Sequence, residues 1–160
     1  MKTKGMIILV MLFACISGYA QDSLFDKLTD KEDITQVTVT KSLLNLMPSM
    51  ATSVDMNGVD MKDIVTKLEQ IDIFSTKNEK SRSMMRNETN KHFNNNKSYE
   101  VLMKVKDEKD NIVFYGQKEN NFIKSLIMFV DGDNESVLIR LLGKFTTEDI
   151  QNMMKGIDKE

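Results

Sequence analysis

The stretch that decides the fold is Tyr99–Gly143, YEVLMKVKDEKDNIVFYGQKENNFIKSLIMFVDGDNESVLIRLLG. Four apolar segments rich in β-branched and aromatic residues alternate in it with short turns rich in Asp, Asn, Gly and Lys, which is typical of strands joined by hairpins. Because residues two apart share a face of a strand, Val101, Met103 and Val105 are expected to lie together. We predict a four-stranded antiparallel meander, with strands at 99–106, 112–116, 122–130 and 137–142.

Short helices and strands alternate before the meander. The pattern predicts helices at 22–29, 41–47 and 60–68, strands at 34–40 and 71–75, and a polar loop at 49–58. After the meander, Thr146 and Asp149 have the spacing of a capping box, which predicts a C-terminal helix. The order of elements favours an α+β fold with an antiparallel-rich sheet of about six strands and helices packed on one face. The strand order does not follow from this pattern.

Lys77–Lys97 is predicted to be a helix that contacts the sheet through a narrow stripe of side chains, Ser81, Met85, Thr89, His92 and Phe93. The segment has six basic side chains against two acidic ones, a net charge of +4. Such a face can attract a negatively charged partner, and it is also typical of an ordinary solvated helix. The candidate partner contacts on this helix are Lys80, Arg82 and Arg86.

The first twenty residues have the order of a secretory signal peptide. Lys2 and Lys4 precede an apolar run of eleven residues, Met6–Ile16, and small residues follow at Gly18 and Ala20. A helix of that length spans about 16 Å, roughly half of the hydrocarbon core of a membrane. The pattern therefore predicts a cleaved signal peptide, and no transmembrane span in the mature form.

Cleavage before Gln21 would leave residues 21–160 as a single exported α+β domain, in the periplasm or at the outer-membrane or cell surface. The alternative is lipidation at Cys15, because Leu12–Cys15 (LFAC) loosely resembles a lipobox. Phe13 is bulkier than the residue usual at that position, so we favour cleavage before Gln21. The mature chain would then contain no Cys, which excludes disulfides.

Few residues are available for metal or nucleophilic chemistry. The chain has one His, His92, and one Cys, so it has no pair suited to a His–Cys metal site or dyad. The acidic stretch Asp131–Glu135 lacks Gly and Glu at the positions that an EF-hand loop requires, and a hairpin bend explains it better. The net charge of −2 argues against a nucleic-acid partner. We predict no cofactor and no enzymatic activity.

Methionine is unusually frequent, with ten residues after position 20. Its flexible side chain fills irregular gaps in cores, and it also lines adaptable apolar grooves. The Met residues therefore leave open either ordinary core packing or an apolar surface for a partner or ligand.

The segments ITQVTVTKSLLNLMPSM, VLMKVKD and VLIRLLGKFTTEDIQNMM resemble the domain-of-unknown-function family 4252, small exported proteins of Gram-negative bacteria. The resemblance covers roughly Phe25–Met154 and carries no catalytic residues. It implies an envelope protein, and a link to envelope signalling, because similar genes neighbour extracytoplasmic sigma and anti-sigma factors. In such a host, Asp22-Ser23-Leu24 resembles an O-glycosylation acceptor, which makes Ser23 a candidate modification site.

Three functional hypotheses follow from the sequence. The favoured one is a non-enzymatic binding module of the cell envelope whose partner is another envelope protein or a surface component. The alternative is a carrier of a small apolar ligand or lipid, and the least favoured is a hydrolase built from carboxylates or Ser.

Overall fold

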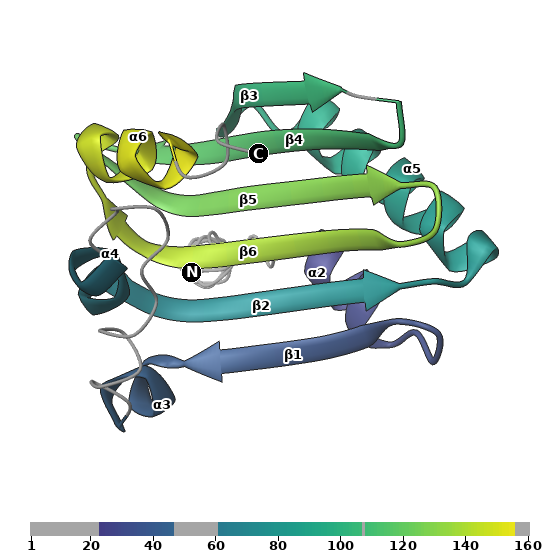
Figure 1. Ribbon diagram of the computed structural model, residues 1–160, viewed down its shortest axis with the longest axis horizontal. Helices are drawn as coiled ribbons and strands as arrows, with labels where there is room; N and C mark the ends of the chain where they lie inside the picture. Colours follow the sequence, from purple (N-terminus) through teal and green to yellow (C-terminus); the bar gives the residue numbers. More distant parts are fainter. Residues whose placement is uncertain (1–22, 47–60, 107, 156–160) are drawn as a thin grey trace, which may run out of the picture.

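The computed structural model describes residues 23–46, 61–106 and 108–155, which form a six-stranded antiparallel sheet with helices (Figure 1). The α+β class predicted from the sequence is confirmed. The strands are β1 Thr35–Thr40, β2 Leu68–Thr76, β3 Tyr99–Lys106, β4 Asp110–Glu119, β5 Phe122–Gly132 and β6 Ser136–Phe145. The helices are α2 Ser23–Thr29, α3 Lys41–Leu46, α4 Met61–Lys67, α5 Glu79–Asn95 and α6 Thr147–Lys155.

The strand order across the sheet is β1-β2-β6-β5-β4-β3. Strands β3 to β6 form the predicted meander, and α6 follows it as expected. Helix α5 carries the chain from β2 to β3 at the far edge, so that the meander returns and closes against β2 (Figure 1). This arrangement leaves β1 and β3 as the two edges of the sheet.

One face of the sheet is covered by α2 and α5. Leu24 and Leu28 of α2 and Met85 of α5 are fully buried in this core. The sheet contributes Phe74, Val113, Tyr115, Ile127, Phe129 and Leu138. On α5 the buried residues are Ser81, Met85, Thr89 and Phe93, which confirms the predicted narrow stripe except for His92, which is only half-buried.

Helices α4 and α6 lie on the opposite face, at one end of the sheet (Figure 1). Ile64 of α4 and Ile150 of α6 are buried in a second cluster with Leu126 and Phe145 of the sheet. The expectation that all helices pack on one face is therefore wrong. The physical reason is that the strands carry apolar side chains on both faces, and helices pack against apolar side chains on each face.

Two local predictions also need correction. Leu68, expected at the end of a helix, begins β2. In β3 the register shifts between Val101 and Met103, which pair with the adjacent residues Tyr115 and Phe114. Since adjacent residues of a strand point to opposite faces, Val101 does not share a face with Met103. The predicted loop at 49–58 and the cap at residue 60 lie outside the described residues.

Candidate functional site

Two rows of uncharged side chains cross all six strands on the face opposite α2 and α5. We call this surface the open face. Within each row, neighbours are directly paired residues of adjacent strands. The first row is Val37, Ile73, Ile139, Met128, Phe114 and Met103, and the second is Thr35, Ser75, Val137, Val130, Ile112 and Val105.

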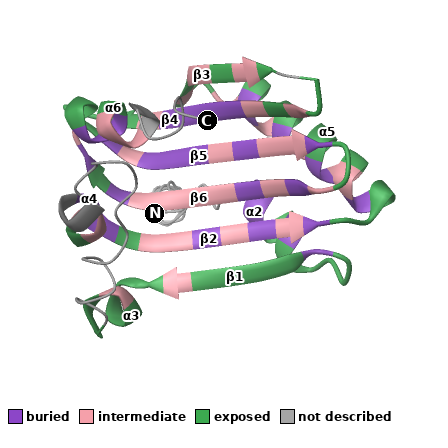
Figure 2. Cartoon of the chain, viewed as in Figure 1, coloured by how far each residue is buried: buried purple, intermediate pink, exposed green. Residues whose placement is uncertain are grey.

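The open face is much less buried than the face beneath α2 and α5. Ile73, Ile139 and Met128 are half-buried, and Val37 is 46% exposed. Phe74 and Leu138, which neighbour Ile73 and Ile139 along the chain but point the other way, are fully buried. Figure 2 shows the difference as intermediate and buried residues that alternate along β2 and β6.

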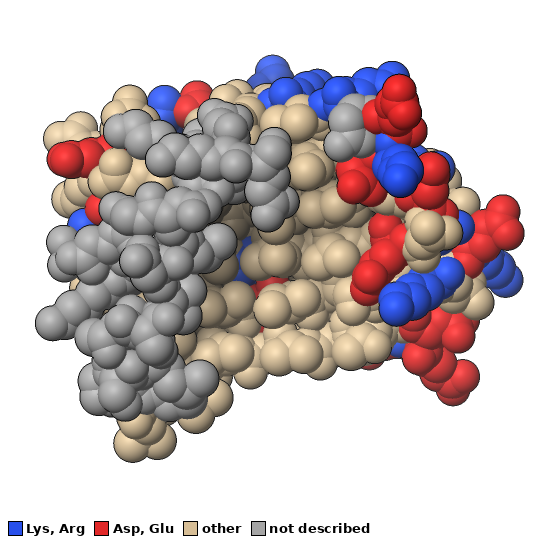
Figure 3. Space-filling model, in the orientation of Figure 1, with Lys and Arg blue, Asp and Glu red and all other residues tan. Residues whose placement is uncertain are grey.

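The exposed part of the open face is also free of charge. Figure 3 shows uncharged surface over the middle of the sheet, next to the residues drawn in grey, with most of the visible Lys, Arg, Asp and Glu side chains along its right and upper edges. Exposed apolar surface costs free energy in water, and large apolar patches on a protein surface mark sites of interaction. A sequence signal was present but was missed. The runs IVFY, LIMFV and VLI in β4, β5 and β6 do not alternate with polar residues, which indicates strands that are apolar on both faces.

Of the predicted contact residues on α5, Arg86 forms an ion pair within the protein. Its Nε and Nη2 atoms donate to Oδ2 and Oδ1 of Asp131 at 2.5 and 2.9 Å. The hydrogen bond and charge of Asp131 raise the pKa of the Arg86 guanidinium above its usual value. Asp131 also accepts a hydrogen bond from the hydroxyl of Ser136, 3.2 Å away.

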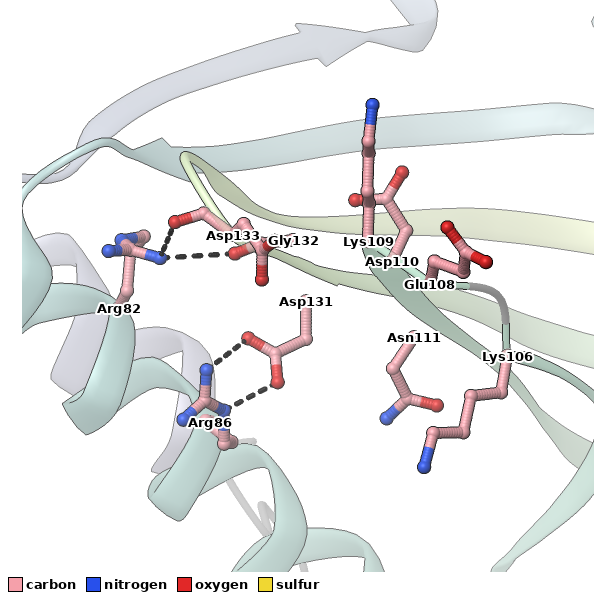
Figure 4. A pocket seen from close by; sticks show the side chains of 10 residues that line it. All are labelled: Arg82, Arg86, Lys106, Glu108, Lys109, Asp110, Asn111, Asp131, Gly132 and Asp133. Atoms are coloured by element: carbon pink, nitrogen blue, oxygen red, sulfur yellow. Dashed lines mark hydrogen bonds and ion pairs between the residues drawn. The ribbon is translucent and has the colours of Figure 1, made fainter.

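Arg82 contacts the same β5–β6 turn through the backbone. Its Nη1 donates to the carbonyl oxygens of Gly132 and Asp133, at 3.1 and 2.5 Å (Figure 4). The structure thus brings Arg82 and Arg86 together, where they hold α5 against the turn, and leaves Lys80 exposed. Contact of these three residues with a partner stays a prediction.

A hollow of about 270 Å³ lies beside this turn (Figure 4). Its lining contains four basic and four acidic side chains, so its charges balance and it has no preference for an anionic ligand. The residues that line it are Arg82, Arg86, Lys106, Glu108, Lys109, Asp110, Asn111, Asp131, Gly132 and Asp133.

A buried ion pair that the sequence analysis missed joins β2 and β6. Asp72 is 2% exposed, and its Oδ2 accepts hydrogen bonds from Nε and Nη2 of Arg140 at 2.9 and 2.8 Å. The hydroxyl of Thr38 and the side-chain amide of Gln70 also donate to the carboxylate. The Arg140 guanidinium lies 3.9 Å from the ring centre of Phe25.

This arrangement satisfies the charges of both partners, as a buried pair in a structural role requires. The signal in the sequence was a single charged residue within each of two apolar runs, IDIF and LIRLL. Pairing the two needed the β2–β6 register, in which Asp72 lies opposite Arg140.

A third carboxylate, Asp149, joins the start of α6 to α4. Its Oδ2 accepts from the backbone N–H of Thr146 at 2.7 Å, and the Thr146 hydroxyl accepts from the Asp149 N–H, which confirms the predicted capping box. Lys67 of α4 donates to Oδ1 at 2.7 Å. Burial opposes ionisation, but the hydrogen bonds from Lys67 and Thr146 outweigh it and lower the pKa of Asp149.

His92 lies in an aromatic cluster. Its ring packs edge-on against Phe93 and Tyr99, with centres 4.9 and 6.0 Å away. Phe93 stacks on Tyr115 at 3.9 Å, and burial raises the pKa of the Tyr115 hydroxyl. No group of three or more His, Cys, Asp or Glu side chains suited to a metal ion occurs among the described residues.

The other residues singled out in the sequence lie in a turn, in the core, at a helix start or outside the described residues. Asp131–Glu135 forms the predicted bend, in which the N–H of Gly132 donates to the carbonyl of Glu135 at 3.0 Å. Met85 is buried and Met84 packs against the same core, which supports core packing for these two residues. Ser23 is the first residue of α2, whereas Cys15 and the predicted signal peptide lie outside the described residues.

The chain is a small α+β protein built on one antiparallel sheet with helices on both faces. The family described as a domain of unknown function, DUF4252, matches residues 25–153, and the chain belongs to this family. No curated protein and no solved structure matches the chain. Within the described residues, no helix is long and apolar enough to cross a membrane.

Proposed function

We propose that this chain is an exported, non-enzymatic binding module of the cell envelope, and that its open face binds another envelope protein. The observation that carries the proposal is the pair of uncharged rows that cross all six strands and, apart from the buried Phe114, stay at least partly exposed. Burying such a surface stabilises a complex by roughly 25 cal/mol per Å² of apolar area, before the costs of association. A protein partner is the occupant that this surface favours.

The chemistry of the partner follows from how the sheet is covered elsewhere. On the open face, α4 and α6 pack at one end through Ile64 and Ile150, with Met153 beside them. On the other face, α2 and α5 cover the sheet in the same way. A partner that presents the apolar stripe of an amphipathic helix would extend the layer of α4 and α6 across the open face.

The non-enzymatic part of the proposal rests on how the buried and half-buried carboxylates are used. Asp72, Asp131 and Asp149 each accept hydrogen bonds from a basic side chain of another element, namely Arg140, Arg86 and Lys67. Carboxylates held in this way connect elements of the fold, whereas a general acid or base needs access to a substrate proton.

Export is supported by the signal-peptide pattern of residues 1–20, with cleavage before Gln21. A partner in envelope signalling would agree with this location.

A small apolar ligand or lipid is the second candidate occupant of the open face, because the same apolar rows could contact it. An open sheet surface fits a macromolecule better, since small-ligand sites are concave and enclose most of the ligand.

The proposal is tested by chemical crosslinking of the native chain in intact cells, followed by purification and mass spectrometry. Ile139→Lys places a charge in the middle of the open face, and Phe122→Lys is the matched control. Phe122 is an exposed apolar residue at the start of β5, outside both rows. Circular dichroism and thermal unfolding establish that both variants fold.

We expect one reproducible envelope protein to be attached to the wild-type chain and to the Phe122 variant, and to be lost from the Ile139 variant. Equal capture by both variants, or no captured protein, would contradict the proposal. A retained apolar small molecule in native mass spectrometry, lost with Ile139→Lys, would instead establish the carrier.

A further inference from the structure

The two edges of the sheet differ in how they are protected against pairing with another strand. Exposed edge strands pair readily with other chains, and proteins prevent this with charged residues, bulges or Pro. At one edge, β3 has a bulge between Val101 and Met103 and carries Glu100, Lys104 and Lys106. At the other edge, β1 (TQVTVT) has no charge, no Pro and six pairs with β2 in unbroken register.

The edge formed by β1 is also exposed and uncharged. Five of its six residues are exposed, and Val37 is the only exposed large hydrophobic residue within the described sheet strands besides Val101 and Phe122. Helix α3, which follows directly, has no buried residue and exposes Leu43 and Leu46, the latter at 78%. Three of the exposed large hydrophobic residues therefore lie within ten residues of chain at this edge.

We propose that β1 pairs with β1 of a second copy of this chain, antiparallel and across a two-fold axis, to form a continuous twelve-stranded sheet. A two-fold axis at Val37 places Val37 opposite its own copy, and Thr35 opposite Val39 on the same face. The first row of the open face then continues from Val37 into the second copy without a charged residue. This inference rests on the edge and is independent of what binds the open face.

The charges that flank β1 select the second copy and its direction. The exposed residues Asp30, Glu32 and Asp33 precede the strand, and the exposed residue Lys41 follows it. With the two-fold axis at Val37, Asp33 of each copy lies beside Lys41 of the other, so opposite charges meet twice. A parallel arrangement would place the acidic ends side by side.

The oligomeric state of the purified exported chain tests this inference, by sedimentation velocity over concentrations from about 1 µM to 1 mM, which brackets weak and moderate affinities. Val37→Lys would place two lysines directly opposite each other at the axis, where like charges destabilise pairing. Val101→Lys is the matched control, since Val101 is 49% exposed on the other edge strand. Thermal unfolding compares the stability of the two variants.

We expect the wild-type chain and Val101→Lys to dimerise, and Val37→Lys to raise the dissociation constant by at least about ten-fold. Lys41→Asp and Asp33→Lys should each weaken the dimer, and the double variant should restore it, because the charges are then exchanged. These changes lie on exposed residues, so they test pairing even if Val37→Lys fails to fold. A monomer at every concentration, equal effects at Val37 and Val101, or no rescue in the double variant would overturn the proposal.

Discussion

At the scale of single residues, Gly143 lies where elements distant in sequence meet at close range. Strand β6 passes the end of α4 at this position, where Gly143 pairs with Leu68. A Cβ on residue 143 would lie 2.8 Å from the Phe145 ring and closer still to the backbone carbonyl oxygen of Lys67. The backbone oxygen cannot move aside as a side chain can, so only glycine fits.

We therefore expect Gly143→Ala to lower the free energy of unfolding by about 1–3 kcal/mol, the usual cost of overpacking. Gly116→Ala is the matched control, since a Cβ there would meet only the side chain of Leu102, 2.8 Å away. That side chain is half-buried and can rotate, which predicts a smaller loss. Urea unfolding of both variants measures the difference, and equal losses would contradict this explanation.

Asp149 gives a prediction for the dependence of stability on pH. Because folding lowers the pKa of Asp149, the ionised carboxylate stabilises the fold above its unfolded pKa, near 4, and this contribution is lost as the pH falls through the folded value. Asp149→Asn should cost up to about 1 kcal/mol at neutral pH, because it removes the charge that pairs with Lys67. Its stability should converge with that of the wild type in acid. Glu148→Gln, at an exposed neighbouring position, serves as the control.

At the scale of elements, α5 is held at both ends by different chemistry. Arg82 and Arg86 attach its first half to the β5–β6 turn, and Phe93 packs its last turn against Tyr115. A salt bridge between Lys27 and Glu88 links the helix to α2 and lowers the pKa of Glu88, chiefly through the hydrogen bond. Basic residues on this helix are therefore partly structural.

Arg86→Met should lower the free energy of unfolding by roughly 0.5–1 kcal/mol, because it leaves the largely buried Asp131 without its bidentate partner. Amide hydrogen exchange should speed up in the first turns of α5. Lys80→Met, at an exposed position, should change neither quantity. If both variants have the same stability and exchange rates, Arg86 does not hold the helix.

A partner contact on α5 is better tested at Lys80 than at Arg86, because Arg86 already forms an ion pair within the protein.

The elements themselves could be predicted from the sequence, whereas their relations in space could not. Local periodicity identified the meander, the stripe on α5 and the capping box at Thr146, because each depends on residues close in the chain. Strand order, the bulge after Val101 and the Asp72–Arg140 pair depend on contacts between distant segments. The open face was missed because the sequence does not show which apolar residues the helices leave uncovered.

At the scale of the whole molecule, the sheet is apolar on both faces but is covered unequally. Among the described helices, α2 and α5 bury one face, and α4 and α6 cover one end of the other (Figure 1). The open face and the unprotected β1 edge meet at Val37, so a dimer through β1 would join two open faces into one surface. The open face is the feature that the proposed function needs and that the rest of the fold does not explain.

The measurement that tests this account most directly is site-specific photo-crosslinking in intact cells. A photoreactive amino acid placed at Met128, in the centre of the open face, is compared with the same amino acid at Phe122. The account predicts that one envelope protein is attached at position 128, through the apolar stripe of a helix, and that none is attached at position 122. Attachment at both positions, or at neither, would contradict the claim that the open face is the binding surface.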